Sequence, residues 1–377
     1  MRLLLPFLLL LGAAPPARAL WVTAYYTGWR QTRLKPADID FSAITHLAHF
    51  GVVPRADGSL DSAINRLTPA SVKETVAAAH AAGRKVLFTV GGQGSRERFA
   101  SAIAAPRRAA FVKNLVAFLR EGGYDGVDVD MEELRAEDAR DYARFIRELR
   151  TALDAVSPRP LLTAAALWQP ALFARLEDRF DQINLMTYNL SGPYSGWVAW
   201  HSGALYSGGA VFPGKKTPLP SADGLVEAFV AAGVPRAKLG IGMSFNAYVW
   251  SGEVSAPGQA WTEPPSIKIL PYYSLAAAYA LGPDGAGPAT RWDAGAQAAY
   301  LSVAGSNPAE ARFVSYENET SAAARVRYAR GKGLGGLIVW DIAAGRRDDV
   351  AAPSRDALLQ AMLRAKTAAT GSKGGAR

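Results

Sequence analysis

The sequence predicts an α/β fold, a (β/α)8 TIM barrel that carries a small inserted lobe. Short β-branched or aromatic runs alternate with longer segments of helical spacing, and eight such runs follow one another along the chain. Spacing alone does not separate a barrel from an open doubly wound sheet, but a count of eight favours the barrel. Of the 377 residues, 49% are hydrophobic and 20% are charged, which is typical of a globular chain with a full core.

Eight segments have the composition of barrel strands, and several are almost continuously apolar, as expected for a parallel sheet covered on both faces. They are Trp21–Tyr26, Ile44–Phe50, Lys85–Val90, Gly126–Asp130, Leu161–Ala165, Gln182–Met186, Lys238–Met243 and Gly336–Trp340. Helical spacing lies between them at Ala70–Ala82, Ala109–Glu121 and Ala136–Val156. Gly83 and Gly122-Gly123 follow the first two of these segments, at positions where helices commonly end.

One interruption of this alternation predicts the inserted lobe. Residues 249–315, between the seventh strand and a helix expected at Ala322–Gly331, are rich in Gly, Pro, Tyr and Trp. A connection of this length within a compact domain usually has secondary structure of its own. We therefore expect a β-rich (α+β) lobe between strand 7 and helix 7, within a barrel domain of residues 20–364.

The first nineteen residues have the pattern of a signal peptide. Arg2 precedes an apolar run from Leu3 to Ala14, and Ala17-Arg18-Ala19 supplies small residues for a cleavage site. The apolar run is too short to cross a bilayer, which takes about 20 residues. We expect residues 1–19 to be removed and the protein to be exported, either to the periplasm or outside the cell, with no membrane span after cleavage.

Cysteine content and charge exclude several classes of protein. The chain has no Cys, which excludes a disulfide scaffold, a thiol nucleophile and a thiolate metal site. Its net charge of +9 falls to about +3 for the barrel, because six bases lie in or beside the two ends. These bases are Arg2 and Arg18 in the signal peptide, and Arg364, Lys366, Lys373 and Arg377 around a predicted disordered basic tail at residues 365–377. A nearly balanced barrel argues against nucleic-acid binding. We expect a monomer without a cofactor.

The fourth predicted strand carries closely spaced acids. Because side chains alternate across a strand, Asp128, Asp130 and Glu132 point to one side, and Val127 and Val129 point to the other. Three carboxyls on one buried face cannot all be ionised cheaply, so at least one should have a raised pKa. Glu132 comes last and should lie at the C-terminal mouth of the barrel, where such enzymes place catalysis. A neutral acid beside carboxylates suits protonation of a glycosidic oxygen.

Two other interpretations of these acids compete with catalysis. One is a structural cluster satisfied by hydrogen-bond donors, which four acids within eight residues make less favourable. The other is a Mg²⁺ or Ca²⁺ site, since both ions take oxygen ligands. Neighbours on one face of a strand, however, are spaced by about 6.5–7 Å and do not converge on one ion. We favour catalysis and expect no metal.

These acids carry a resemblance to glycoside hydrolase family 18, the chitinase and chitinase-like family. Asp125, Asp128, Asp130 and Glu132 match its signature D-x-x-D-x-D-x-E on the fourth barrel strand. Other segments resemble the family in order, so that the resemblance covers residues 20–363. They are Tyr25-Tyr26-Thr27-Gly28-Trp29, His49-Phe50, Val90-Gly91-Gly92, Met186-Thr187-Tyr188-Asn189 and Gly335-Gly336-Leu337-Ile338-Val339-Trp340.

The resemblance implies a retaining, substrate-assisted hydrolysis of β-1,4 bonds next to N-acetylglucosamine. In that scheme the acetamido oxygen of the sugar attacks its own anomeric carbon, and Glu132 is the general acid and base. Asp130 bonds to the acetamide N–H, Asp128 relays charge, and Tyr188 holds the acetamide oxygen. Asp125 is the structural member of the motif.

The resemblance also implies an aromatic cleft, because aromatic faces suit the apolar surface of a pyranose. Trp340 would stack on the sugar at the floor of this cleft. The other residues expected to bind substrate are Tyr25, Phe50, Met186, Asn189, Gly92, Trp168 and Trp197. Further aromatic candidates in loops at the mouth are Trp29, Trp200, Tyr206, Trp250 and Trp261.

The chain departs from the family pattern at two places in the expected cleft. Asn189 stands where the family usually has Asp, which removes one charge near the pocket. Phe245-Asn246-Ala247-Tyr248 stands where F-Y-G-R is common, so a tyrosine and an arginine of the usual cleft are missing. These departures bear on the length of the substrate and on the preference for chitin.

Three functions follow from this reading, and each has chitin or another N-acetylglucosamine-containing glycan as its partner. The leading hypothesis is an exported chitinase. The second is a hydrolase of the same mechanism that acts on peptidoglycan or N-glycan cores. The third is a non-catalytic, lectin-like chitin-binding protein, against which the intact Glu132 argues because such family members typically lose this acid.

Overall fold

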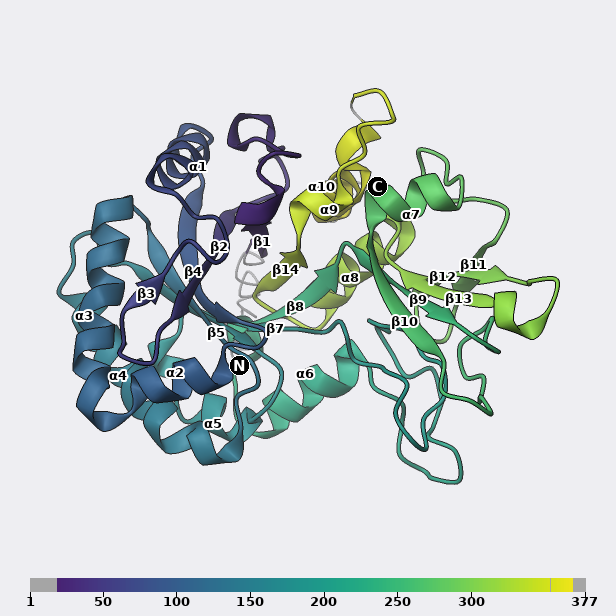
Figure 1. Ribbon diagram of the computed structural model, residues 1–377, viewed down its shortest axis with the longest axis horizontal. Coiled ribbons are helices and arrows are strands. Elements are labelled where there is room, and N and C mark those ends of the chain that lie inside the picture. The colour runs from purple at the N-terminus through teal and green to yellow at the C-terminus, as the bar shows by residue number, and fades with distance from the viewer. Residues whose placement is uncertain (1–18, 353, 369–377) are drawn as a thin grey trace, which may run out of the picture.

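A parallel barrel with an antiparallel lobe beside it makes up the computed structural model, which describes residues 19–352 and 354–368 (Figure 1). Eight parallel strands run around the barrel in the order β1-β14-β8-β7-β6-β5-β4-β2, and pairing of β1 with β2 closes it. The second sheet has the order β10-β9-β13-β12-β11, and its strands all lie between β8 and α8 in the chain. The predicted (β/α)8 barrel with a lobe between strand 7 and helix 7 is therefore confirmed.

The barrel strands agree with the predicted segments to within a few residues. They are β1 (Trp21–Thr27), β2 (His46–Pro54), β4 (Lys85–Gly92), β5 (Gly126–Met131), β6 (Leu161–Ala166), β7 (Gln182–Leu185), β8 (Leu239–Ser244) and β14 (Gly336–Trp340). β2 runs past its predicted end because the short β3 (Leu60–Asp61) pairs with Val53 and Pro54 in antiparallel register.

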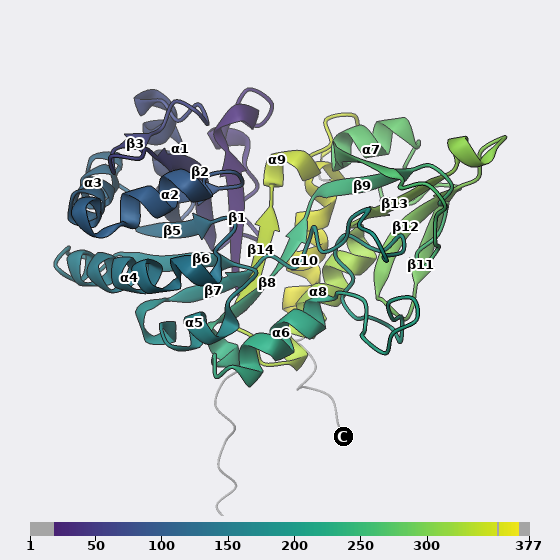
Figure 2. The ribbon, with the colours of Figure 1, turned by 60° about the horizontal axis from the view of Figure 1, so that its bottom comes forward.

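Helices cover the outer wall of the barrel (Figure 2). They are α1 (Pro69–Ala81), α2 (Arg96–Ile103), α3 (Ala105–Gly122), α4 (Ala139–Asp154), α5 (Pro170–Ala174), α6 (Ala222–Ala231), α8 (Glu319–Gly331), α9 (Ile342–Gly345) and α10 (Ala357–Ala368). Thr68 and Ser71 form a capping box at the start of α1, and Gly123 ends α3 in the left-handed conformation, with φ of 70°. Within residues 19–352 and 354–368, no helix is both long and apolar enough to span a membrane.

The ends of the chain agree only partly with expectation. α10 continues to Ala368, so residues 365–368, expected in the disordered tail, are helical instead. The helix persists because its apolar residues Leu358, Leu359 and Met362 are buried in the main core. The rest of the predicted tail lies outside the described residues, as does the predicted signal peptide apart from Ala19.

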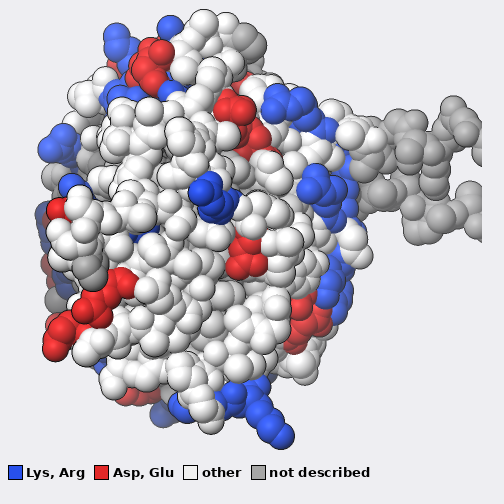
Figure 3. Space-filling view, turned by 90° about the vertical axis from the view of Figure 1, so that its right-hand side faces the viewer, with Lys and Arg blue, Asp and Glu red and all other residues white. Residues whose placement is uncertain are grey.

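The lobe is an α+β unit, as predicted. Its strands are β9 (Asn246–Ser251), β10 (Ser266–Pro271), β11 (Thr290–Asp293), β12 (Ala298–Val303) and β13 (Arg312–Tyr316), and α7 (Tyr272–Ala278) follows β10. On the lobe side of the molecule, charged side chains of both signs are scattered over a larger uncharged surface (Figure 3). This face therefore does not present a charge field of a single sign.

The inside of the barrel is polar at both ends, whereas the space between strands and helices is apolar. Near the N-terminal ends of the strands, Trp21 Nε1 donates to Asn184 Oδ1 at 3.2 Å, and Thr23 Oγ1 donates to Gln182 Oε1 at 2.7 Å. On β5, Val127 is fully buried in the core beneath the helices, as the predicted alternation requires. The acids of the same strand therefore point into the barrel.

A buried ion pair joins the lobe to the barrel. Glu317 follows β13, and its Oε1 lies 2.7 Å from Nη2 of Arg325 on α8, with side-chain exposures of 9% and 2%. Arg325 also donates to the carbonyl of Gly242 on β8 at 3.1 Å and to the carbonyl of Gly203. One guanidinium thus satisfies acceptors from the lobe, a barrel strand and the long loop after β7.

Replacing Arg325 by Met tests this connection. We expect the free energy of unfolding to fall by about 3–5 kcal/mol, because the substitution leaves the Glu317 carboxylate buried without its partner. Urea unfolding of the purified variant measures the change. Arg327→Met is the matched control, since Arg327 is exposed on the same helix, and it should stay within about 0.5 kcal/mol of the parent. Equal losses in both variants would contradict the assignment.

Candidate active site

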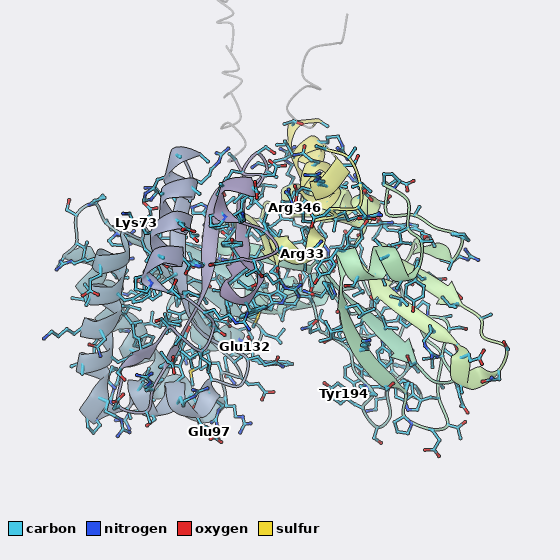
Figure 4. All side chains as sticks on the ribbon, turned by 45° about the horizontal axis from the view of Figure 1, so that its top comes forward. Arg33, Lys73, Glu97, Glu132, Tyr194 and Arg346 are labelled. Atoms are coloured by element: carbon cyan, nitrogen blue, oxygen red, sulfur yellow. The ribbon has the colours of Figure 1, made fainter. Side chains whose placement is uncertain are left out.

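A cleft of about 990 Å³ opens at the C-terminal ends of the barrel strands. Its lining includes Tyr25 from β1, Asp130 from β5 and Trp340 from β14, together with Tyr248 from the lobe. Figure 4 labels Glu132 at this cleft, together with two other residues that line it, Glu97 in the first turn of α2 and Tyr194 in the loop after β7. The cleft is therefore bounded by both the barrel and the lobe.

Most residues that the sequence singled out lie in this one cleft. Those that line it are Glu132, Asp130, Tyr188, Trp340, Tyr25, Phe50, Met186, Asn189, Gly92 and Trp168. Asp128 is fully buried beneath them, inside the barrel. Residues far apart in the sequence thus meet because each follows, or ends, a parallel strand.

Hydroxyl groups from the two strands beside β5, and from β1 across the barrel, hold Asp128. Tyr25 Oη donates to Oδ2 at 2.8 Å, Thr89 Oγ1 donates to Oδ2 at 3.1 Å, and Thr163 Oγ1 donates to Oδ1 at 2.5 Å. Burial raises the pKa of Asp128, while the three hydroxyl donors lower it by stabilising the ionised form, and burial is the larger effect. The side chain is fixed in one orientation below Asp130.

The side chains of Asp130 and Glu132 share a hydrogen bond, so the two acids titrate as a pair. Burial raises the pKa of Asp130 well above its ordinary value, and the negative charges of Glu132 and Asp128 raise it further. Burial also raises the pKa of Glu132. The pair therefore retains a proton above the usual range of carboxyl groups, in accord with the expectation that the acids of this strand do not all ionise.

Asp130 also has an unused acceptor. Its Oδ1 is buried and has no hydrogen-bond partner in the described part of the chain. A buried carboxylate oxygen without a donor is unfavourable unless a ligand supplies one. The atom is available to an N–H or O–H group of a molecule in the cleft.

Aromatic rings form the floor of the cleft. The Trp340 ring packs edge-on against Phe50, with ring centres 4.9 Å apart, and against Tyr25, with centres 5.5 Å apart. Gly92 permits this packing, because a Cβ at its position would lie 2.4 Å from the Phe50 ring, and its φ of 100° also favours glycine. The rings buttress one another, so the floor is preorganised.

Tyr188 is largely buried at the side of the cleft. Its ring occupies space left by Gly242, where a Cβ would lie 2.6 Å from a ring carbon. Burial raises the pKa of Tyr188 well above its ordinary value, and the charges of Asp130 and Glu132 raise it further. The hydroxyl therefore stays protonated and can act as a hydrogen-bond donor.

Asn189 and Trp168 lie on the exposed part of the cleft. Asn189 has a left-handed backbone conformation, with φ of 57°, and its backbone N–H donates to Ser202 Oγ at 3.1 Å. Trp168 follows β6 and is 55% exposed, which leaves its ring accessible to a ligand. Trp29, a further aromatic candidate, also lines the cleft.

Trp197 does not line the cleft, contrary to expectation. Its ring packs instead between Tyr194, at 5.1 Å, and Phe212, at 4.9 Å. Tyr194 is the residue of this loop that reaches the cleft, and it is 59% exposed. Trp197 thus supports Tyr194 from behind. Of the other aromatic candidates, Trp200 and Trp250 are buried in cores of their own.

Sequence reasoning did not single out Tyr194 or Tyr142 as cleft residues. The available signal for Tyr194 was its place in a loop rich in Gly, Pro and Ser after a barrel strand, where ligand-binding residues concentrate. Tyr142 gave no such signal, because it lies on α4 and is almost fully buried in the main core, yet it also borders the cleft.

Asp125 lies at the opposite end of β5 from the cleft. Its carboxylate accepts hydrogen bonds from the backbone N–H of Val86 at 2.9 Å and from Lys85 Nζ at 2.8 Å, and it contacts His80 Nε2 at 2.8 Å. These contacts join the starts of β4 and β5.

Comparison with known proteins gives one consistent family. The model of glycosyl hydrolases family 18 matches residues 22–345. Chitinase A1 from Niallia circulans is 28% identical over 295 residues, which are 70% of this chain but only 41% of that protein. Chitinase 1 from Aphanocladium album is 26% identical over 369 residues, with 86% of this chain and 81% of that protein covered.

Solved structures share the fold. A Group IV chitinase from Ostrinia furnacalis superimposes with a TM-score of 0.78 at 21% identity, covering 92% of this chain and 99% of that chain. The structure of a GH18 chitinase from Cycas revoluta in complex with (GlcNAc)3 has a TM-score of 0.73 at 22% identity, covering 92% and 99% of the two chains.

Replacing Thr163 by Val tests how Asp128 is held. The lost hydroxyl stabilises the ionised carboxylate, so its removal raises the pKa of Asp128 in the folded state further above the value of about 3.9 in the unfolded chain. A folded-state pKa above the unfolded one destabilises at high pH, and the penalty disappears as the pH falls below about 3.9. We expect a loss of about 1–3 kcal/mol at pH 8 and a smaller loss at pH 4 by urea unfolding.

Thr163→Ser keeps the hydroxyl and serves as the control, with little pH-dependent loss expected. If Thr163→Val lowered the free energy of unfolding equally at both pH values, Asp128 would not depend on this donor for its charge.

Proposed function

The chain belongs to glycosyl hydrolases family 18, and from this membership and the cleft we propose that it hydrolyses β-1,4 bonds next to N-acetylglucosamine, as a chitinase. The single observation that carries the proposal is the acid pair in the cleft, where Glu132 and Asp130 share a hydrogen bond above the aromatic floor. The names of the related proteins support chitin as the substrate class.

Glu132 is the proposed general acid and base. It lies at the mouth of the barrel, half-buried, with a pKa that burial raises. In its protonated form it gives a proton to the glycosidic oxygen as the bond from that oxygen to the anomeric carbon breaks. The resulting carboxylate then takes a proton from the water that attacks the same carbon. Glu132 thus ends the cycle protonated, as it began.

The nucleophile belongs to the substrate in this proposal. The acetamido oxygen of the sugar bonds to the anomeric carbon and forms a cyclic oxazolinium ion, which water then opens with retention of configuration. Asp130 supports this step, because its unpartnered Oδ1 can accept the acetamide N–H and stabilise the positive charge of the ring. Tyr188, kept protonated by its raised pKa, can donate to the acetamide oxygen and orient it.

Substrate binding also explains how the shared proton reaches Glu132. Asp130 and Glu132 share a hydrogen bond and both have a raised pKa, so in the free protein the pair holds a proton in common. An acetamide N–H that donates to Asp130 stabilises its ionised form, and the two acids titrate together. The proton then passes to Glu132, where the reaction needs it. Asp128 lies beneath the pair, and its negative charge raises the pKa of Asp130.

Export is proposed on the amino-terminal sequence alone. Arg2, the apolar run from Leu3 to Ala14 and the small residues at Ala17 and Ala19 have the order of a signal peptide. Extracellular or periplasmic localisation would bring the cleft to insoluble polysaccharide outside the cytoplasm.

Glu132→Gln tests the reaction. Because glutamine cannot transfer a proton, we expect the release of reducing sugar from colloidal chitin to fall by at least about 10²-fold. Binding of chitin oligosaccharides should be retained. Glu137→Gln is the control. Glu137 is an exposed acid that follows Glu132 closely in the chain, and it pairs with Arg96 and takes no part in the proposed reaction. Equal release by the parent and the Glu132→Gln protein would contradict the catalytic assignment of Glu132, and binding of chitin oligosaccharides by the parent without any release would indicate a binding protein.

Analysis of the products formed by the parent protein identifies the substrate. Products from chitin oligosaccharides should keep the β configuration at the new reducing end, as seen by NMR immediately after cleavage. Cleavage of peptidoglycan or an N-glycan core, with none of chitin oligosaccharides, would replace the proposed substrate while leaving the mechanism intact.

Glu133→Gln should change the pH dependence. The negative charge of Glu133 raises the pKa of Glu132 after the larger effect of burial, so its removal lowers that pKa. The alkaline limb of the profile of kcat/KM should then move to lower pH, by roughly 0.2–0.5 unit because Glu133 is 68% exposed and screened by water. The shift should shrink in about 1 M NaCl. A shift to higher pH, or none at low salt, would contradict this electrostatic role.

A further inference from the structure

The residue that follows Trp340 is a buried carboxylate. Asp341 is 1% exposed and caps α9, where its Oδ1 accepts the backbone N–H of Ala344 at 3.0 Å. Its other oxygen, Oδ2, lies 3.2 Å from Nε of Arg30. A carboxylate buried this deeply needs a cation, because its desolvation is otherwise uncompensated.

Arg30 reaches the lobe at the same time. It lies in the turn directly after β1, and its side chain is 19% exposed. Nη2 lies 3.3 Å from Oδ1 of Asn246, at the start of β9, and Nη1 lies 3.4 Å from Oη of Tyr273 on α7. From the loop after the first barrel strand, the Arg30 guanidinium therefore contacts the residue that follows the last barrel strand and two elements of the lobe.

This junction adjoins the floor of the cleft. Trp29, next to Arg30 in the chain, lines the cleft and packs against Trp340 with ring centres 6.4 Å apart. The carbonyl of Trp340 accepts the backbone N–H of Phe245, immediately before β9, at 2.6 Å. The backbone of Trp340 is thus tied to the lobe on its carbonyl side, and to Arg30 through the next residue.

We propose that Arg30 is a positioning residue, which fixes the Trp340 platform and the lobe wall of the cleft by binding Asp341, Asn246 and Tyr273 together. The inference rests on the proposed function, since Trp340 is a platform only if a sugar occupies the cleft. An arginine suits this place because its planar fork presents several donors in fixed directions, whereas a lysine is a point charge.

The neighbouring arginine provides a matched comparison. Arg33 and Arg346, labelled in Figure 4, lie at the same junction, where Arg33 Nη2 donates to the carbonyl of Arg346 at 2.9 Å. The Arg33 guanidinium also stacks on the Tyr273 ring at 3.5 Å and pairs with Asp348 at 3.0 Å. Arg33 contacts Tyr273 of the lobe and does not contact Asp341. Its loss should therefore weaken the contact between turn and lobe but leave the position of Trp340 unchanged.

Arg30→Gln and Arg33→Gln test the proposal with a kinetic readout on chitin oligosaccharides. Because a stacking platform binds the sugar in both the ground state and the transition state, its loss raises KM more than it lowers kcat. For Arg30→Gln we expect KM to rise about tenfold with kcat within about threefold, and for Arg33→Gln a KM within about twofold of the parent. Equal changes in KM for the two variants would overturn the proposal.

A second variant separates positioning from general loss of stability. Asparagine at position 341 can still cap α9 but carries no charge. In the Asp341→Asn variant the Arg30 guanidinium no longer faces a negative charge at position 341. Adding Arg30→Gln to this variant should therefore raise KM less than adding it to the parent chain. Fully additive losses would show that Arg30 does not act through Asp341.

Hydrogen exchange measured by mass spectrometry needs no substrate and keeps the two proposals distinguishable. Arg30→Gln should speed exchange in peptides covering residues 340–345 and 245–249, and Arg33→Gln should not. If the parent protein cleaved no N-acetylglucosamine polymer while Arg30→Gln still sped hydrogen exchange in these peptides, the proposed function would be wrong. The role of Arg30 in holding these segments together would then be supported. If the parent cleaved chitin while exchange and KM were unchanged in Arg30→Gln, the positioning role would fail alone.

Discussion

Burial of the carboxyls on β5 is the constraint on which the rest of the barrel depends. Asp128 and Asp130 point into a closed sheet, where unpaired charge is strongly unfavourable. Hydroxyl groups of Thr89 and Thr163 on the two adjacent strands, and of Tyr25 on β1 across the barrel, donate hydrogen bonds to Asp128. Three strands thus carry a polar residue where barrel interiors usually hold aliphatic ones. The same burial raises the pKa values of the acids, and it gives one carboxyl group a proton to transfer.

Two sets of charged contacts join the lobe to the barrel, and each lies just behind a residue that lines the cleft. Arg325 and Glu317 join the end of β13 to β8, next to Gly242, whose missing side chain makes room for Tyr188. Arg30 and Asp341 join the lobe to the end of β14, next to Trp340. Each guanidinium contacts several chain segments, because the planar fork of arginine presents several donors in fixed directions, whereas lysine is a point charge. The cleft therefore depends on contacts that no single strand provides.

The sequence was informative where a local pattern is tied to one geometry. Alternation along β5 predicts which acids point into the barrel, and position at a strand end predicts that Tyr25, Phe50 and Trp340 meet in one cleft. It was less informative in loops, where no periodicity relates neighbouring side chains. Trp197 and Tyr194 lie three residues apart in one Gly-rich loop, and only packing on Phe212 decides which ring faces the cleft. Likewise, α10 continues into the segment predicted as a disordered tail because apolar residues earlier in the helix pack into the core.

By itself, the sequence determined the barrel, the place of the lobe in the chain, the family and the acid pair, because strand periodicity and the D-x-x-D-x-D-x-E spacing are local properties of the chain. Only the tertiary structure decided how strongly the pKa values of that pair are raised, since this depends on burial and on charges brought together by the fold. It alone also placed Arg30 against Asp341, residues from opposite ends of the chain that become neighbours because β1 and β14 pair as the barrel closes.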